Sequence, residues 1–493
     1  MQGIAYWIDK RAELHPERIA IITEKEQISY KVLKLDVDKL ATFLKQDLSI
    51  KAGERIAILS HNRYEYIVLL FAIAKLECIA VPLNTRLTEN ELLYQLNDSG
   101  TEILFLETNF KSTTISLQKK SKLREIIPIE NVRNLEDRNK NISLHINESA
   151  PFIICYTSGT TGKPKGAVLT QDNMFWNAIN NCTAIDITSN DRSLVLLPLF
   201  HIGGIGLFAF PTLFTGGTII LPEGKFDSEK ALSLIEQHQV TIVMGVPTIH
   251  QAILNSPSFE KTNLESVRWF YNGGAPCPHE LIQAFFDKGL LFGQGFGMTE
   301  TSPTLFMLSK EDAKRKIGSI GKPVMFCDYK LIDSEGAIVK RGDIGELIVR
   351  GPNVMKEYWN KPEATAEALQ DGWLYTGDLA RVDEEGFLYI VGRKKEMIIS
   401  GGENIYPLEL EQIIGQLADV VEVAVVGVVD VKWGETPVAF VVKKIESLLT
   451  EEEIIEYCKL FLARYKIPQK IEFIEKLPRN ATGKIQKNQL VNS

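Results

Sequence analysis

Strand-like and helical segments alternate near the start of the chain, and this alternation restricts the fold more than any other feature. Apolar runs typical of buried strands span residues 54–59, 78–83 and 102–106. The segments between them, at 62–76 and 89–96, carry apolar residues at helical spacing. Helical crossovers of this kind join parallel strands. The pattern therefore predicts an α/β fold with a large N-terminal layered domain whose sheets are rich in parallel strands.

The length of the chain and a change of pattern near residue 395 predict a second domain. A single core rarely extends over 493 residues. After residue 395, a helix with Pro407 in its first turn precedes strand-like runs, and Thr450 opens a capping box with Glu453. We therefore expect an N-terminal domain over residues 1–394 and a small α+β domain over residues 395–493.

Composition narrows the classes of partner and compartment. The formal net charge of −8 predicts no general attraction to nucleic acid. The six cysteines form no C-x-x-C pair, which argues for a reducing compartment and against a disulfide framework or a zinc site. Charged side chains occur among the first eleven residues, which leaves no uninterrupted apolar region of the kind that a signal peptide needs. These features favour a cytoplasmic protein without a nucleic-acid partner.

Residues 193–222 contain no Asp, Glu, Lys or Arg, a length that could span a membrane. The segment also contains Pro198, Pro211 and five glycines, so we expect a strand, a loop, a buried helix and a second strand instead. Peripheral membrane contact would require a basic or amphipathic surface patch.

Three loops rich in glycine follow strand-like runs and are candidates for nucleotide binding. The first contains glycines, hydroxyls and a lysine that suit a phosphate, at Thr157, Ser158, Gly159, Thr160, Thr161, Gly162 and Lys163. It is not a P-loop, because Pro164 follows Lys163. The other two loops span residues 271–276 and 294–300. Ligands bind beyond the carboxyl ends of parallel strands, so we expect the three loops to meet at one crevice.

Several side chains near these loops have a defined chemistry. Phe296 offers a face for stacking a purine, Thr299 a hydroxyl for a phosphate oxygen, and Glu300 a hard oxygen ligand for Mg²⁺. Asp378 is expected in a tight turn, where an acid could accept hydrogen bonds from a ribose. His201 lies in apolar surroundings, where a histidine is usually a core residue, although the adjacent glycines would let a ligand approach.

These motifs, in this order, resemble those of the adenylate-forming superfamily, which includes acyl-CoA synthetases, the adenylation domains of peptide synthetases and luciferases. The resemblance covers essentially the whole chain. It implies that a carboxylate attacks the α-phosphate of ATP with Mg²⁺ bound, which gives an acyl-adenylate and pyrophosphate. A thiol, expected to be that of CoA, then displaces AMP to give a thioester.

The resemblance also implies a role for individual residues. Gly274, Ala275, Pro276 and Phe296 would contact adenine, Gly297 would also belong to the nucleotide site, and Asp378 and Arg393 would hold the ribose. Lys484 would enter the site for adenylate formation, with Thr299, Glu300 and His201 as the other catalytic groups. The small C-terminal domain would be mobile and rotate at a hinge, Lys395, and a tunnel for the thiol would include Ser400, Gly401, Gly402 and Glu403.

The expected acyl pocket carries no formal charge, which suits an alkyl tail. Its predicted walls are Asn177, Asn181, His201, Ile202, Gly203, Gly204, Val246, Pro247 and Thr248. We therefore expect a CoA ligase for fatty acids of medium or long chain. One alternative is an o-succinylbenzoate-CoA ligase of menaquinone biosynthesis, because residues 401–407 resemble a run in the C-terminal part of those enzymes. The others are a ligase for an aryl acid and a stand-alone enzyme that loads a carrier protein. A luciferase-like oxygenase and a non-catalytic sensor are further hypotheses; a sensor would be expected to have lost Lys484 or Glu300.

Overall fold

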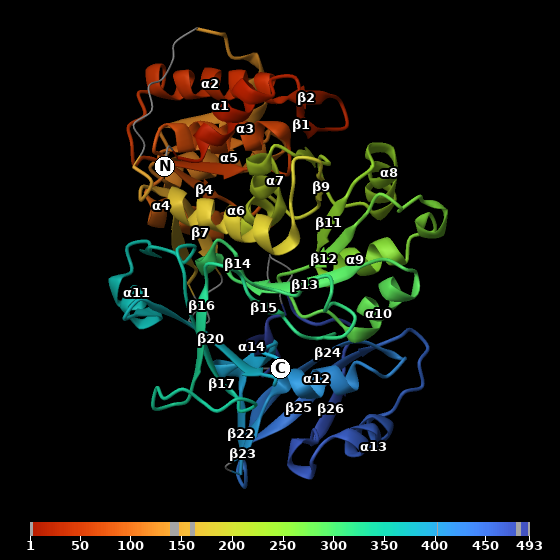
Figure 1. Ribbon diagram of the computed structural model, residues 1–493. Coiled ribbons are helices and arrows are strands. Elements are labelled where there is room, and N and C mark those ends of the chain that lie inside the picture. The colour runs from red at the N-terminus through yellow and green to blue at the C-terminus, as the bar shows by residue number, and fades with distance from the viewer. Residues whose placement is uncertain (1–2, 139–146, 158–162, 402, 480–484, 492–493) are drawn as a thin grey trace. The chain divides into compact units, whose positions relative to one another are not determined.

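The computed structural model describes residues 3–138, 147–157, 163–401, 403–479 and 485–491, shown as coloured ribbon in Figure 1. The chain divides into two compact units. The first comprises Met1–Cys277, Leu281–Asp328 and Arg350–Leu374, and the second comprises Pro278–Glu280, Tyr329–Val349 and Tyr375–Ser493.

The expected parallel sheet forms the centre of a seven-stranded sheet in the first unit, with the strand order β18-β8-β7-β4-β3-β5-β6. The strands from β7 to β6 in this order pair in parallel, whereas β8 and β18 are antiparallel to their neighbours. Their bounds are β3 (Arg55–Leu59), β4 (Ile79–Pro82), β5 (Ile103–Leu106), β6 (Glu125–Pro128), β7 (Pro151–Thr157), β8 (Lys165–Thr170) and β18 (Glu357–Tyr358).

A second sheet of nine strands has the order β15-β14-β13-β12-β11-β9-β10-β1-β2. Its central strands pair in parallel, whereas β14, β15 and β2 are antiparallel to the strands beside them. The bounds are β1 (Ile19–Ile22), β2 (Gln27–Ser29), β9 (Arg192–Val195), β10 (Thr218–Ile220), β11 (Ile242–Gly245), β12 (Trp269–Asn272), β13 (Phe292–Gly297), β14 (Thr304–Met307) and β15 (Lys322–Pro323). Together the two sheets confirm the layered α/β domain.

Helices connect these strands and lie against the sheets (Figure 1). They are α1 (Ala5–Leu14), α2 (Tyr30–Gln46), α3 (Tyr64–Lys75), α4 (Glu89–Ser99), α5 (Lys111–Lys120), α6 (Gln171–Ile185), α7 (Phe210–Thr215), α8 (Ser228–His238), α9 (Pro247–Leu254), α10 (His279–Asp287) and α11 (Pro362–Ala368). The helix expected at 62–76 forms as α3, whose apolar spacing suggested one buried face, but it is buried along its whole length. It packs against α1 and α2, and its charged end is neutralised because Lys75 pairs with Asp9 and Asp38.

The uncharged segment folds as predicted. It forms β9, a π-helical turn at Gly204–Ala209 (η3), α7 and β10, and α7 packs against α6 and α1. In the part of the chain that the structure describes, no helix is long and apolar enough to cross a membrane.

Two expectations about loops are wrong. Residues 294–297 belong to β13 and pair with β14, so the third glycine motif is largely strand. Glycine is required there because a Cβ at Gly297 would lie 1.7 Å from the carbonyl oxygen of Pro303. Asp378, expected in a tight turn, lies within strand β20 (Trp373–Val382).

The second unit contains most of a sheet with the strand order β16-β17-β20-β19, in which β21 also pairs with β20. The bounds are β16 (Asp328–Ile332), β17 (Gly345–Arg350), β19 (Leu369–Gln370) and β21 (Leu388–Arg393). A second sheet contains β22 (Ile398–Ser400), β23 (Glu403–Ile405), β24 (Val420–Asp430), β25 (Gly434–Lys443) and β26 (Lys470–Phe473). The helices are α12 (Pro407–Ile414), α13 (Glu451–Phe461) and α14 (Lys487–Leu490), and Thr450 caps α13 as expected.

The second unit includes residues 329–349 and 375–394, which the sequence places in the N-terminal domain. These residues group with the C-terminal chain because α12 packs against β21, which belongs to the same sheet as β17 and β20. The boundary at Lys395 is the point at which the C-terminal domain is expected to rotate, and it stays a prediction.

Candidate active site

The predicted phosphate loop joins the antiparallel strands β7 and β8, so it is a hairpin connection. Thr157 ends β7 opposite Lys165. Ser158, Gly159, Thr160, Thr161 and Gly162 lie outside the described residues. The ammonium group of Lys163 lies 5.8 Å from the ring centroid of Tyr94, and that of Lys165 lies 5.2 Å from the ring of Tyr358. Two cations therefore lie on the C-terminal side of this loop.

Glu300, which also lies in the first unit, carries a buried carboxylate. Its exposed fraction is 6%. Tyr358 donates a hydrogen bond of 2.8 Å from its hydroxyl to Oε1 of Glu300, and Met355 donates its backbone N–H to the Glu300 carbonyl at 2.7 Å. The half-buried Thr299 precedes it in the short 3₁₀ helix Thr299–Thr301. The Tyr358 ring thus contacts both the carboxylate and a lysine of the phosphate hairpin.

This arrangement fits a magnesium ion that a nucleotide brings with it. Among the described residues, no group of three or more His, Cys, Asp and Glu side chains could enclose a metal. Mg²⁺ usually retains waters and takes only one or two protein carboxylates, with phosphate oxygens as further ligands. The single carboxylate of Glu300 meets that requirement.

The second glycine loop follows β12, the parallel neighbour of β13. Asn272 is buried and donates from its amide to the carbonyl of Ala275 at 3.0 Å, which closes the loop. Gly274 has a φ of +84°, which favours glycine, and residues 274–276 are exposed. Because Asn272 at the end of β12 pairs with Gln294, this loop follows β12 beside the last residues of β13, which include the half-buried Phe296. The structure thus brings together the predicted adenine-binding groups.

His201 is half-buried at the start of the turn that leads into η3. Its backbone N–H donates to the carbonyl of Pro198 at 3.1 Å. Burial, and secondarily the charge of Arg86, lower the pKa of His201 to about 4. The imidazole is therefore neutral near pH 7.

A small apolar cavity of about 10 Å³ lies beside this turn, with room for roughly one water molecule. Of the predicted acyl-pocket residues, Gly203 and Gly204 line it. No motif pointed to its remaining walls, which come from β9 and the residues after it, from η3 and from β11: Leu194, Val195, Leu196, Leu197, Phe208, Ala209 and Met244. Ile202, Val246, Pro247 and Thr248 do not line it, and Thr248 is exposed at the start of α9.

Asn177 and Asn181, also expected in the pocket wall, are fully buried. Both amides donate to the carbonyl of Gly206, at 2.7 and 3.3 Å, and Asn181 also bonds to the Thr304 hydroxyl. These side chains therefore hold α6 against η3 and β14 and present no free surface to an acid.

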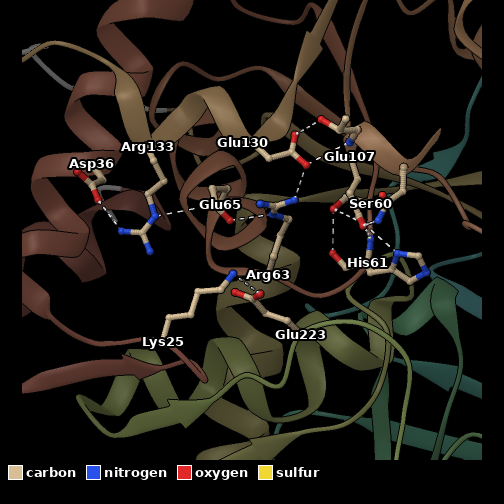
Figure 2. A network of polar contacts seen from close by, with 12 residues as sticks. Lys25, Asp36, Ser60, His61, Arg63, Glu65, Glu107, Glu130, Arg133 and Glu223 are labelled. Carbon is tan, nitrogen blue, oxygen red and sulfur yellow. Dashed lines mark hydrogen bonds and ion pairs between the residues drawn. The ribbon is translucent and has the colours of Figure 1, made fainter. Parts of the chain in front are cut away.

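Asn62 was not identified from the sequence. Its side-chain oxygen accepts the N–H of Leu199 at 2.7 Å, and its amide donates to the carbonyl of Leu197 at 2.9 Å. It follows Ser60 and His61, which bond to Glu107 at the ends of β3 and β5 (Figure 2). Asn62 thus clamps the loop between the cavity wall and His201. Only its distant contact partners in the fold reveal this role.

In the second unit, Asp378 and Arg393 come together as predicted. They face each other across β20 and β21, and Nε of Arg393 lies 2.9 Å from Oδ1 of Asp378. The Asp378 side chain is 4% exposed. The ion pair holds the carboxylate that would accept hydrogen bonds from a ribose.

The other predicted residues of the second unit lie near β22. Lys395 is in the short 3₁₀ helix Lys394–Glu396 (η6), where the neighbouring Lys394 pairs with Glu346 at 2.6 Å. Ser400 ends β22, and Gly401 donates its N–H to the carbonyl of Trp433 at 2.8 Å. Glu403 is exposed at the start of β23. Gly402 and Lys484 lie outside the described residues.

Comparison with known proteins identifies similar chains along the full length. Residues 8–359 match the family description AMP-binding enzyme, and residues 409–484 match AMP-binding enzyme C-terminal domain. A feruloyl-CoA synthase of an Amycolatopsis species is 40% identical over 99% of this chain and 98% of its own.

Two solved structures extend the similarity to the fold. An o-succinylbenzoate CoA synthetase from Bacillus subtilis, in complex with its acyl-adenylate intermediate, is 37% identical with a TM-score of 0.89, covering 98% of this chain and 97% of its own. A Mycobacterium tuberculosis fatty acyl CoA synthetase is 35% identical with a TM-score of 0.81, covering 100% and 98%.

Proposed function

This chain belongs to the family of AMP-binding enzymes and is an AMP-forming acid–CoA ligase, and we propose that its acid is an aryl monocarboxylic acid. Its substrates are the acid, ATP with Mg²⁺, and CoA. The products are the acyl-CoA thioester, AMP and pyrophosphate, formed through an acyl-adenylate.

We assign charge neutralisation and positioning to the residues that the motifs single out. Lys163 and Lys165 lie beside the phosphate hairpin and would attract the ATP phosphates. Glu300 would hold Mg²⁺, which supplies positive charge to the phosphates when bound. Asp378 would hold the ribose, and Lys484 would stabilise negative charge as the acid carboxylate attacks. The reaction needs no side-chain nucleophile, so accurate placement is the main contribution of the protein.

The observation that favours an aryl acid is the similarity to relatives named for aromatic acids, a feruloyl-CoA synthase and an indoleacetate–CoA ligase, at 40% and 37% identity. The cavity beside His201 is lined by apolar residues and glycine. At about 10 Å³ it holds roughly one water molecule, so its size does not select among acids. The relatives named for ferulate and o-succinylbenzoate act on aromatic acids, which supports the same substrate class.

The walls predicted for the acyl pocket carry no formal charge, which favours one carboxylate over two. A fatty acid remains the second candidate, because it shares the single carboxylate and because one solved relative is a fatty acyl CoA synthetase.

The test is release of AMP and pyrophosphate with MgATP, with and without CoA. The acids are ferulate, benzoate, o-succinylbenzoate, octanoate and palmitate. We expect the highest kcat/KM for ferulate or benzoate, with turnover that requires CoA. Rates that rise with alkyl length would assign the enzyme to fatty acids, selective use of o-succinylbenzoate would assign it to quinone synthesis, and adenylation without CoA-dependent turnover would indicate a carrier protein as acceptor.

A further inference from the structure

Lys487 places a largely buried ammonium group between two carboxylates in the second unit. Its Nζ lies 2.7 Å from Oε1 of Glu411 and 3.0 Å from Oε2 of Glu396. The Lys487 side chain is 20% exposed and that of Glu411 is 15% exposed. Burial alone would lower the pKa of Lys487, but the two carboxylates outweigh it and the pKa is raised. Lys487 is therefore a fixed cation near pH 7.

The two carboxylates belong to different elements. Glu396 ends η6 and directly follows the predicted hinge residue, Lys395. Glu411 lies on α12, and its Oε1 also accepts the backbone N–H of Val425 in β24 at 2.8 Å. Lys487 therefore joins the C-terminal segment both to the residue after the hinge and to the core of the second unit.

The chain on either side of Lys487 is also held in place. Ile485 pairs with Arg479 in an antiparallel bridge, and the N–H of Gln486 donates to the carbonyl of Pro478 at 2.8 Å. Leu490 is buried in a cluster with Leu477, against which Ile485 packs. The residues that directly follow Lys484 thus have a defined position within the second unit.

From this geometry we infer that Lys487 is a positioning residue for adenylate formation, because its ion pairs fix the segment after Lys484 to the segment after Lys395. The inference rests on the proposed function and on the predicted role of Lys484. A rotation at Lys395 would carry Glu396, Lys487 and the start of α14 together. Loss of the link would misplace Lys484, and a displacement of about 1 Å can cost on the order of 100-fold in rate.

The test measures the two half-reactions separately in Lys487→Met. We expect acid-dependent pyrophosphate release to fall about 10- to 100-fold. Thioester formation from supplied acyl-adenylate and CoA should stay close to wild type, because Lys484 acts only in the first step. Lys487→Arg keeps the charge and should restore most of the first half-reaction.

Lys466→Met is the matched control. Lys466 pairs with Glu409 of the same helix α12 at 2.8 Å, and its side chain is also 20% exposed. This variant loses a similar ion pair without any contact to η6, so both of its half-reactions should remain near wild type.

Glu396→Gln provides a second test if Lys487→Met fails to fold, because it removes the ion pair of Lys487 with Glu396 and keeps its ion pair with Glu411. Pyrophosphate release should fall in this variant as well, while thioester formation stays close to wild type. An equal fall of both half-reactions, or a wild-type rate of adenylation in both variants, would overturn the inference. The wild-type rates report on the proposed function by themselves, whereas the ratio of the two rates in each variant reports on Lys487.

Discussion

Tyr358 donates a hydrogen bond of 2.8 Å to the buried carboxylate of Glu300, and the ring that carries this hydroxyl also lies under the ammonium group of Lys165. The hydroxyl fixes the orientation of the carboxylate that we assign to Mg²⁺. Groups that orient a metal ligand in this way usually alter metal affinity when they are removed.

Tyr358→Phe keeps the ring and removes the hydroxyl. We expect the Mg²⁺ concentration for half-maximal adenylation to rise about 10-fold. The KM for the acid should not change, because Tyr358 is not a wall of the apolar cavity. A titration of Mg²⁺ at saturating ATP measures the effect, and an unchanged Mg²⁺ requirement would show that Tyr358 does not orient a metal ligand.

The clamp made by Asn62 predicts a selective effect on the acid. Asn62→Ala removes the hydrogen bonds to Leu197 and Leu199, which hold the loop before His201. We expect the KM for the acid to rise about 10-fold, the effect of roughly 1.4 kcal/mol, while the KM for ATP stays near wild type. Steady-state kinetics with each substrate varied in turn provides the measurement. An equal rise in both KM values would mean that Asn62 supports the unit as a whole.

Two adjacent glycines should respond differently to alanine. A Cβ at Gly204 would lie 2.2 Å from the carbonyl oxygen of Pro198, so Gly204→Ala forces the backbone to move and should cost about 1–3 kcal/mol of stability. A Cβ at Gly203 would lie 3.5 Å from Leu197 and Leu207, an ordinary contact.

Gly203→Ala should therefore keep the melting temperature near wild type and reduce kcat/KM for bulky aryl acids more than for benzoate. Thermal unfolding and kinetics on purified variants test the pair. Similar melting temperatures for the two variants would contradict the packing seen at Gly204.

Two histidines whose pKa values are lowered on folding predict how stability depends on pH. The pKa of His201 falls from its ordinary value of 6.5 to about 4 on folding, and burial lowers the pKa of His250 to about 4 as well. Between these values the unfolded chain binds protons that the folded chain does not. Stability is therefore complete above about pH 6.5 and is lost as the pH falls toward 4.

Thermal unfolding between pH 4.5 and 7 measures this loss. His201→Gln should lose less stability than wild type over that range, with a remaining slope from His250. In addition, kcat/KM should show no ionisation of His201 near pH 6.5. Parallel slopes for wild type and His201→Gln would show that the imidazole is protonated in the folded protein.

The strands and helices of the first unit were predictable where local periodicity and burial agree. The run at 54–59 became β3, and the predicted helix at 89–96 became α4. The burial of α3 on all sides was not predictable, because its charged end is neutralised by Asp9 and Asp38 from α1 and α2. Long-range ion pairs of this kind leave no local signal.

The glycines of β13 explain why its last residues were taken for a loop. A Cβ at Gly295 would meet the carbonyl oxygen of Phe306 on β14, and one at Gly297 would meet that of Pro303 just before β14. Glycine there therefore reflects close backbone approach rather than a turn. Likewise, the Asn62 clamp and the Met244 wall depend on segments far apart in sequence. The motifs therefore identified the chemistry of the site, whereas the shape of the acyl cavity needed the structure.

The most direct test of the substrate assignment is a competition between ferulate and palmitate at equal concentration with MgATP and CoA. The ratio of the two acyl-CoA products, measured by mass spectrometry at low conversion, equals the ratio of their kcat/KM values. We predict that feruloyl-CoA is the main product. A mixture dominated by palmitoyl-CoA would contradict the proposal that the enzyme acts on an aryl acid.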